Sequence, residues 1–183
     1  QSLFEPKRPA ELNKNERVLS LKTDEVKPDT QFGVTLKNID LEVYQSEILG
    51  IGGVAGNGQE ELMQILTGEK IDQSVSLKYM DNDIQMLNPR ERREMGLAFA
   101  PEERLGHAAV ANLNLLENSL ITDPKKRFEK KMGFINFVEL NLYTNEIIEK
   151  FNVKTTGASA LASSLSGGNL QKFVVGRELG QKP

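Results

Sequence analysis

The sequence predicts an α/β fold, and two stretches lead to this prediction. A short apolar run at residues 47–52 precedes a glycine-rich loop at 53–58 and an amphipathic run at 59–67, which is the order of a strand, a loop and a helix. Later in the chain, a serine and two glycines at 166–168 introduce a second helical pattern. With 183 residues, the chain is long enough to bury a core as one domain, or as one domain with a subdomain.

The N-terminal part is expected to form antiparallel β-structure after a linker. Residues 1–17 are polar, contain prolines and show no sustained period, which predicts a linker from a preceding domain. Alternating residues at 18–22 and 36–43 predict edge strands, and a further strand is expected at 75–79. The apolar run at 47–52 instead suits a strand of a buried parallel sheet, because such strands are covered on both faces.

Two helices with identifiable ends are expected in the first hundred residues. The first spans 59–67 and ends at Gly68, since glycine readily adopts the left-handed backbone that closes a helix. The second is a charged helix through Met95, with Asn88 as its cap and Pro89 at its first position. A short buried strand is then predicted at 97–100.

The C-terminal half is predicted to be mainly helical, from 113 to about 151, with a basic break at 125–131. Residues 155–164 are small and polar and predict a loop, and a helix is expected from Asn169. The clearest amphipathic stripe has these apolar members at helical spacing: Leu140, Tyr143, Ile147, Ile148 and Phe151.

Composition excludes several classes of function. The chain has no cysteine and one histidine, so neither a disulfide framework nor a Cys- or His-based metal cluster is expected. The formal net charge of −3 gives no reason to expect nucleic acid as a partner. No apolar run approaches the ~20 residues that span a bilayer, and no signal peptide opens the sequence, so we expect a soluble, cytoplasmic chain that reaches a membrane only by docking.

The serine–glycine corner is a candidate anion site. Ser166 is expected to cap the following helix, and Gly167 and Gly168 let the backbone approach a ligand closely. Free N–H groups and the positive end of the dipole gather at a helix N-terminus, which favours a phosphate. The alternative is a loop before an amphipathic helix, with no ligand.

The glycine loop matches the phosphate-loop pattern at three positions and departs from it at two. Gly53, Gly56 and Gly58 stand where the pattern G-x-x-x-x-G-K-[ST] and its extra glycine require. Gln59 replaces the lysine, and Glu60 replaces the hydroxyl residue that binds Mg²⁺. At ~5 Å and an effective dielectric near 20, a carboxylate repels each phosphate charge by ~3 kcal/mol.

This loop is therefore expected to bind nucleotide weakly, or only in an assembly, and to hydrolyse it poorly. A cation held between Glu60 and the phosphates would reverse the sign of the repulsion, which makes Glu60 a candidate metal ligand. The alternative is a tight turn with no ligand.

The octet at 165–172 resembles the signature motif of ABC transporter ATPases, in the form most similar to importers of simple sugars and nucleosides. In those importers two ATP-binding halves are fused, and the second half has a phosphate loop like 56–62, with Asn57 between its glycines. The resemblance implies a P-loop NTPase (RecA-like) core with an antiparallel β-subdomain and an inserted helical subdomain. It divides the chain into a β-subdomain and P-loop core at 18–102, a helical subdomain at 103–164 and the signature segment at 165–183.

The resemblance also implies roles for individual residues. Ser166, Gly167, Gly168 and Asn169 would close over the γ-phosphate of ATP, with its Mg²⁺, held by a partner nucleotide-binding domain. Glu102 stands where typical members have the Q-loop glutamine. The Walker B strand, its catalytic glutamate and the switch histidine are not found, so we expect the chain to be C-terminally incomplete, without a catalytic residue and inactive by itself.

The partners that the resemblance implies are a second nucleotide-binding domain in the same polypeptide, transmembrane permease subunits and, indirectly, a solute-binding protein, at the cytoplasmic face of the plasma membrane. One alternative is a non-catalytic module with a P-loop-like fold that only docks to a membrane subunit. Another is an ABC-type ATPase of DNA repair, which the acidic balance of the chain disfavours.

Overall fold

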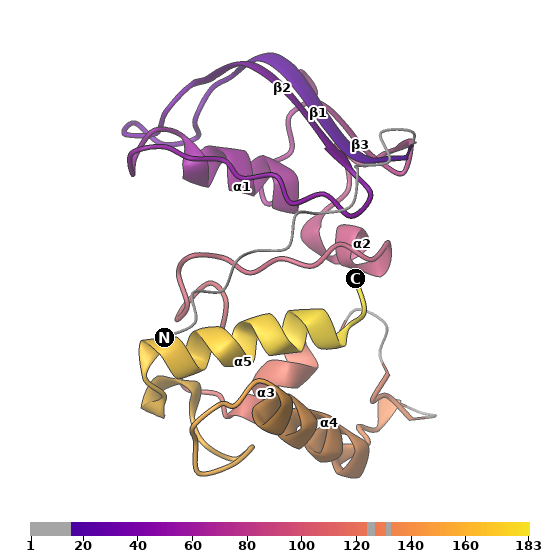
Figure 1. The fold of residues 1–183 in the computed structure, drawn as a ribbon, viewed down its shortest axis with the longest axis vertical. Helices are drawn as coiled ribbons and strands as arrows, with labels where there is room; N and C mark the ends of the chain where they lie inside the picture. Colours follow the sequence, from indigo (N-terminus) through magenta and orange to yellow (C-terminus); the bar gives the residue numbers. More distant parts are fainter. Residues whose placement is uncertain (1–15, 124–126, 131–132) are drawn as a thin grey trace, which may run out of the picture. The chain divides into compact units, whose positions relative to one another are not determined.

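A computed structural model describes residues 16–123, 127–130 and 133–183 (Figure 1). The chain divides into two compact units, Gln1–Arg92 and Arg93–Pro183. Most of the predicted linker at 1–17 lies outside the described residues, as does part of the basic break at 125–131. The sequence-based boundaries after 102 and 164 stay predictions.

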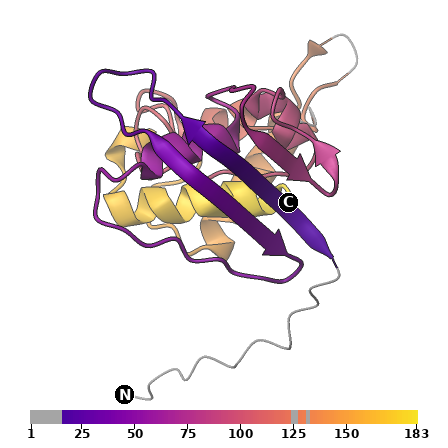
Figure 2. The ribbon, with the colours of Figure 1, turned by 90° about the horizontal axis from the view of Figure 1, so that it is seen from above.

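The first unit contains an antiparallel sheet, as the alternating patterns predicted. Its strands are β1 (Arg17–Val26), β2 (Leu36–Tyr44), β3 (Ser76–Tyr79) and β4 (Asn82–Asp83), in the order β2-β1-β3-β4. Leu21 of β1 pairs with Leu41 on one side and Leu77 on the other. Leu21 and Leu77 are buried. Helix α1 (Gln59–Thr67) lies against one face of the sheet (Figures 1 and 2).

The predicted helix ends of this unit are confirmed. Helix α1 begins directly after the glycine loop and ends at Gly68, whose φ of 87° is left-handed and whose N–H donates to the Gln64 carbonyl. Helix α2 (Pro89–Glu94) begins with a reciprocal cap: the Glu91 N–H donates to Asn88 Oδ1 at 3.1 Å, and the Asn88 N–H donates to Glu91 Oε2 at 2.8 Å.

A buried arginine fixes the end of α1. The guanidinium of Arg92 donates to the carbonyls of Ile65 and Leu66, in the last turn of α1, and to those of Gln85 and Leu87. The carbonyls in the last turn of a helix have no N–H donor within that helix. Arg92 therefore supplies hydrogen bonds to carbonyls that burial would otherwise leave unpaired. Burial lowers the pKa of the Arg92 guanidinium below its usual value.

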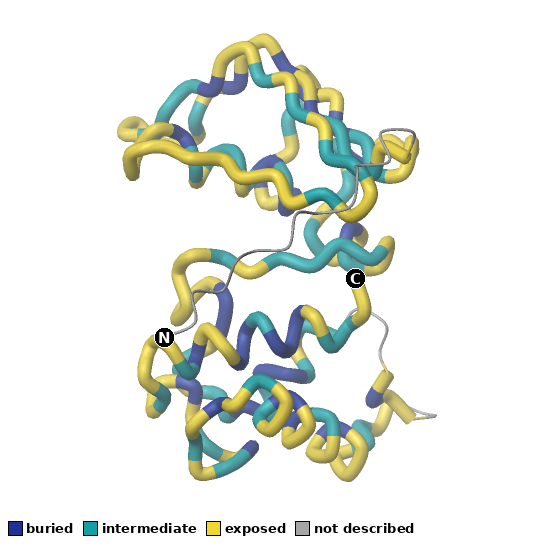
Figure 3. The backbone as a smooth tube through the Cα atoms, viewed as in Figure 1, coloured by how far each residue is buried: buried dark blue, intermediate teal, exposed yellow. Residues whose placement is uncertain are grey.

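Two predicted strands are wrong. Residues 47–52 and 97–100 form no strand, and Ile48 and Ile51 are 97% and 55% exposed. Figure 3 shows how exposed and buried stretches alternate along the backbone. A parallel strand is stabilised by neighbours on its edges, and the described residues supply none for either run. Both runs are apolar, but among the described residues neither has a neighbouring strand with which its backbone could pair.

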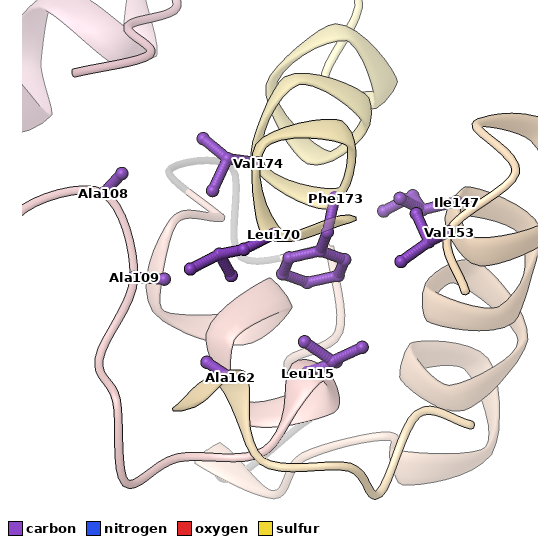
Figure 4. Packing of buried hydrophobic residues seen from close by; sticks show 9 residues of the cluster. All are labelled: Ala108, Ala109, Leu115, Ile147, Val153, Ala162, Leu170, Phe173 and Val174. Carbon is purple, nitrogen blue, oxygen red and sulfur yellow. The ribbon is translucent and has the colours of Figure 1, made fainter. Parts of the chain in front are cut away.

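The second unit is helical. It contains α3 (Leu115–Ile121), α4 (Phe137–Lys150), the 3₁₀ turn η2 (Ala162–Ser164) and α5 (Gly167–Gly180). The predicted stripe of α4 faces inward, with Leu140 and Ile147 buried and Tyr143, Ile148 and Phe151 packed at the edge of the core. Figure 4 shows Phe173 of α5 among Leu115 and Ile147, at the centre of a cluster with these members: Ala108, Ala109, Leu115, Ile147, Val153, Ala162, Leu170, Phe173 and Val174.

Candidate functional site

The glycine loop of the first unit has the backbone that its glycines predict. Gly56 and Gly58 have φ of 85° and 94°, which other residues adopt only with strain. At Gly58 space is also lacking, because a Cβ there would lie 2.7 Å from Leu36 Cδ2. Gly58 is the N-cap of α1 and makes no side-chain cap, so the first N–H groups of α1 are not taken by a capping side chain.

Gln59 bonds to its own loop instead of projecting from it. Its Oε1 accepts the backbone N–H of Asn57 at 2.9 Å, and its Nε2 donates to the Val54 carbonyl at 2.8 Å. The same Nε2 lies 2.9 Å from the position of a Cβ at Gly53. The side chain that replaces the phosphate-loop lysine therefore brings no positive charge. Its Oε1 also takes the hydrogen bond of the Asn57 N–H, which would otherwise be available to a phosphate oxygen.

Glu60 projects to solvent at the start of α1. Its Oε1 accepts a hydrogen bond from Gln64 Nε2 at 3.3 Å. Within the described part of the chain, no three His, Cys, Asp or Glu side chains gather as a metal site would require. Glu61 has a structural role that the sequence did not reveal, because its Oε1 accepts the Val34 N–H at 2.7 Å and ties α1 to the segment before β2.

The serine–glycine corner of the second unit is exposed. Helix α5 begins at Gly167, two residues earlier than predicted, and Ser166 is its N-cap with extended backbone. The prediction that the Ser166 side chain caps the helix is wrong, because Ser166 Oγ instead accepts a hydrogen bond from Asn169 Nδ2 at 2.9 Å. Ser166, Gly167 and Gly168 face solvent, and a Cβ at Gly168 would meet nothing within 4 Å.

Arg104 borders this corner, and Glu102 lies two residues before it in the sequence. Glu102 is exposed, at the start of a turn in which the Ala109 N–H donates to the Arg104 carbonyl at 2.8 Å. The guanidinium of Arg104 lies so close to Gly167 that a Cβ there would collide with it. The sequence does not predict this contact, since nothing local in it indicates where Arg104 reaches.

A buried ionic group anchors the C-terminal part of α5, the helix that begins at the corner. Arg177 donates to Glu178 Oε1 at 3.0 Å and to the Ala108 carbonyl at 2.8 Å, and Glu178 Oε2 accepts from Arg93. Burial lowers the pKa of the Arg177 guanidinium, and the adjacent Glu178 carboxylate opposes that shift. The sequence placed Arg177 and Glu178 on the helix but gave no sign that they would be buried.

Apart from Glu102, the predicted site residues form two groups, one in each unit. Gly53 and 56–60 share the glycine loop and the first turn of α1, and 166–169 share the start of α5, where the Arg104 guanidinium also lies. Each group offers backbone N–H donors at a helix N-terminus. None of the described helices is long and apolar enough to cross a membrane.

An antiparallel sheet over α1, a glycine loop at the start of that helix and a separate helical unit define an α/β protein of the P-loop NTPase class. The family model described as ABC transporter matches residues 36–183. The chain belongs to the ABC transporter family.

Curated relatives are about one third identical to the chain. The nucleoside import ATP-binding protein NupA of Lactococcus lactis subsp. cremoris is 35% identical over 91% of this chain and 33% of its own length. The guanosine import ATP-binding protein NupO of Bacillus subtilis is 34% identical, over 85% of this chain and 30% of its own length. The ribose import ATP-binding protein RbsA of Clostridium tetani is 32% identical, over 78% and 28%. The chain therefore spans about a third of the length of these relatives.

Solved structures confirm the fold class. The dimeric bacterial ABC transporter cassette MJ0796 superposes with a TM-score of 0.69 at 20% identity, covering 90% of this chain and 70% of that one. The ADP conformation of the cassette MJ1267 gives 0.65 at 20% identity, over 91% and 66%. At this level of identity the likeness concerns the fold alone.

Proposed function

We propose that the chain is a nucleotide-binding domain of an importer that couples ATP binding and hydrolysis to the uptake of a simple sugar or a nucleoside. The proposal is supported by relatives named for nucleoside, guanosine and ribose import. It places the chain at the cytoplasmic face of the plasma membrane, docked to permease subunits and, through them, serving a solute-binding protein. We further propose that it is the second of two such domains in one polypeptide, and that the divisions 18–102, 103–164 and 165–183 are its functional parts.

The observation that carries the proposal is the exposed corner at the start of α5. Ser166, Gly167 and Gly168 face solvent, and no side chain caps the helix behind them. Uncapped N–H groups and the helix dipole stabilise a phosphate that is held opposite them. We propose that this corner, with Asn169, completes an ATP site built mainly by a partner nucleotide-binding domain, while Glu102 senses the ion or the permease.

The loop before α1 has a lesser role in this proposal. Gly56 and Gly58 give the loop its left-handed turns, but the Gln59 side chain bonds inside it and adds no charge, and Glu60 adds a repulsive charge. ATP would bring its Mg²⁺, which offsets phosphate charge and could be contacted by Glu60. Turnover at this loop is expected to be poor, so the cycle of ATP-driven closure and hydrolysis-driven opening depends on the other site.

Substitution of Gly168 tests the role of the corner. Because a Cβ at Gly168 meets nothing within 4 Å, we expect Gly168→Ala and Gly168→Asp to be accommodated without a collision at Cβ. We expect Gly168→Asp to abolish ATP turnover by the native polypeptide assembled with its permease, since its carboxylate repels the γ-phosphate. Asn145→Asp adds the same charge on the exposed face of α4 and should leave turnover unchanged. Normal transport by the Gly168→Asp variant would refute the role.

The self-bonded side chain of Gln59 favours a second candidate function. A loop whose own amide fills its nest suits a non-catalytic module that only docks to a membrane subunit. Photo-crosslinking with an ATP analogue in the assembly separates the two. Labelling of the 165–172 segment supports the ATP-site role, and labelling of neither the loop nor the corner supports docking alone.

A further inference from the structure

We infer that Asn169 is a positioning residue that holds the Ser166 hydroxyl so that it donates outward, toward an anion at the corner. The inference rests on the proposed function of this corner and adds to it the residue that sets the direction of a donor. It depends on a chain of two hydrogen bonds that runs from a backbone N–H through one amide to one hydroxyl.

The first bond fixes which way the Asn169 amide faces. The backbone N–H of Lys154 donates to Asn169 Oδ1 at 3.0 Å. A backbone N–H can only donate, so the atom that it meets must be the carbonyl oxygen of the amide, and not the nitrogen. The Asn169 Nδ2 must then face the opposite way, toward Ser166.

The second bond fixes the Ser166 hydroxyl. Asn169 Nδ2 lies 2.9 Å from Ser166 Oγ, and an amide nitrogen can only donate. Ser166 Oγ is therefore the acceptor, and its own hydrogen cannot point at Asn169. The hydroxyl is exposed and makes no bond to the helix backbone, so its hydrogen points away from the protein, where an anion would accept it.

The support for Asn169 is rigid. Val153, next to Lys154, is buried in the core, and its N–H donates to the Ile148 carbonyl at 2.9 Å. Lys172, one turn further along α5, donates through Nζ to the Asn152 carbonyl at 3.2 Å. The two residues before Lys154 are thus held in place, and a rigid support keeps a donor close to its productive geometry.

The same arrangement keeps the helix donors available. A serine at an N-cap normally turns its oxygen back to accept an N–H of the first helical turn. Here Asn169 holds that oxygen, so the N–H groups at Gly167 and Gly168 are not taken by Ser166. One amide therefore supplies the corner with an oriented hydroxyl and with uncapped backbone donors.

The isosteric substitution Asn169→Asp is expected to reverse the direction in which the Ser166 hydroxyl donates its hydrogen. A carboxylate still accepts the Lys154 N–H, but its second oxygen can only accept from Ser166, which turns the Ser166 hydrogen inward. At neutral pH we expect ATP turnover by the native polypeptide with its permease to fall about tenfold or more, as for a lost bond to a charged group. Because a protonated Asp donates again, the ratio of variant to wild-type turnover should rise as the pH falls toward the ordinary Asp pKa of about 4.

A double-mutant cycle separates positioning from simple charge repulsion. We expect Asn169→Asp to cost several-fold less when Ser166→Ala is already present, because the hydroxyl on which it acts is gone and only the repulsion between charges remains. An equal loss with and without Ser166 would overturn the inference, as would wild-type turnover and an unchanged pH profile in Asn169→Asp. Asn145→Asp is the control for added charge.

Failure of the proposed function gives a different result. If Gly168→Asp leaves turnover unchanged, the corner does not serve ATP, and both the function and the inference fall. If only Ser166→Ala leaves turnover unchanged, the inference falls and the function stands. If Ser166→Ala lowers turnover and Asn169→Asp does not, only the inference falls. Thermal unfolding checks that each variant folds; should Asn169→Asp fail to fold, Asn169→Ala enters the same cycle, with the same Ser166-dependent loss expected.

Discussion

Gly176 of α5 and Phe151 at the end of α4 approach so closely that a Cβ on Gly176 would lie 2.6 Å from Phe151 Cδ2. It would also lie 2.9 Å from Ile147 Cγ2. The absence of a side chain at Gly176 therefore sets how near α5 comes to α4, and with it the position of the corner at the start of α5. Neither residue was singled out by its sequence pattern for this contact.

We expect Gly176→Ala to destabilise the chain by about 1–3 kcal/mol, because overpacking a close helix crossing forces backbone shifts. The gain in helix propensity, at most about 1 kcal/mol, offsets only part of this cost. The free energy of unfolding in urea measures the difference.

Gly168→Ala is the matched control, since a Cβ at Gly168 meets nothing within 4 Å. Its stability should be unchanged or up to about 1 kcal/mol higher. Equal stability of the two alanine variants would contradict the packing account of α5.

We expect Glu178→Gln to cost about 3–5 kcal/mol of unfolding free energy. The Glu178 side chain is 4% exposed and contacts Arg177 and Arg93, so removing its charge leaves two guanidinium groups near the interior without their anion. Chemical denaturation again supplies the measurement.

The exposed pair of Lys22 and Asp40 provides the comparison. Their charged atoms are 2.8 Å apart, but both side chains are more than 60% exposed, so solvent screening and lost side-chain freedom offset most of the attraction. Asp40→Asn should therefore have a small effect. A loss as small in Glu178→Gln would show that the buried group does not anchor α5.

We expect Gln59→Lys to strengthen ATP binding by the chain by about tenfold or more, because an added cation at ~5 Å attracts each phosphate charge by ~3 kcal/mol at an effective dielectric near 20. It also removes the amide that now accepts the Asn57 N–H. Calorimetry with ATP and Mg²⁺ compares the two proteins. Gln73→Lys adds the same charge at another exposed glutamine and should not change the affinity. Sub-micromolar ATP binding by the wild-type chain would refute the account of a weakened loop.

Asp72 should contribute to stability only above acidic pH. Its pKa is lowered by hydrogen bonds from the Ser74 side chain, at 2.7 Å, and from the Ser74 backbone N–H, at 2.9 Å. Because the folded pKa lies below the unfolded value of about 4, the contribution is present above that pH and is lost as the pH falls through the folded pKa. Unfolding free energies of wild type and Asp72→Asn should therefore converge in acid. A gap that stays constant from pH 7 to pH 2 would contradict this role.

Local signals in the sequence predicted the helix ends and the antiparallel strands well. Asn88 and Gly68 determine helix ends through bonds to residues three or four positions away, which a linear reading can see. The strands predicted at 47–52 and 97–100 are wrong because strand formation needs an edge partner, and the described residues supply none for either run. Periodicity shows that a segment is apolar, but not that its neighbour is present.

For the candidate site, the motif predicted positions but not bonding. Ser166 was expected to cap α5, and the competing partner, Asn169, is only three residues away. Its choice depends on Lys154, which the fold brings to Asn169 across a 15-residue separation. Gln59 is similar, because its bond to the Val54 carbonyl exists only once the glycine loop has formed.

The most direct measurement for the central proposal is photoaffinity mapping with an ATP analogue that is reactive at its γ-phosphate, bound to the native polypeptide with its permease. The account predicts that the labelled peptide of this chain contains residues 165–172, and that Gly168→Asp removes the label while Asn145→Asp does not. Labelling confined to residues 53–60, or a label at 165–172 that persists in Gly168→Asp, would contradict it.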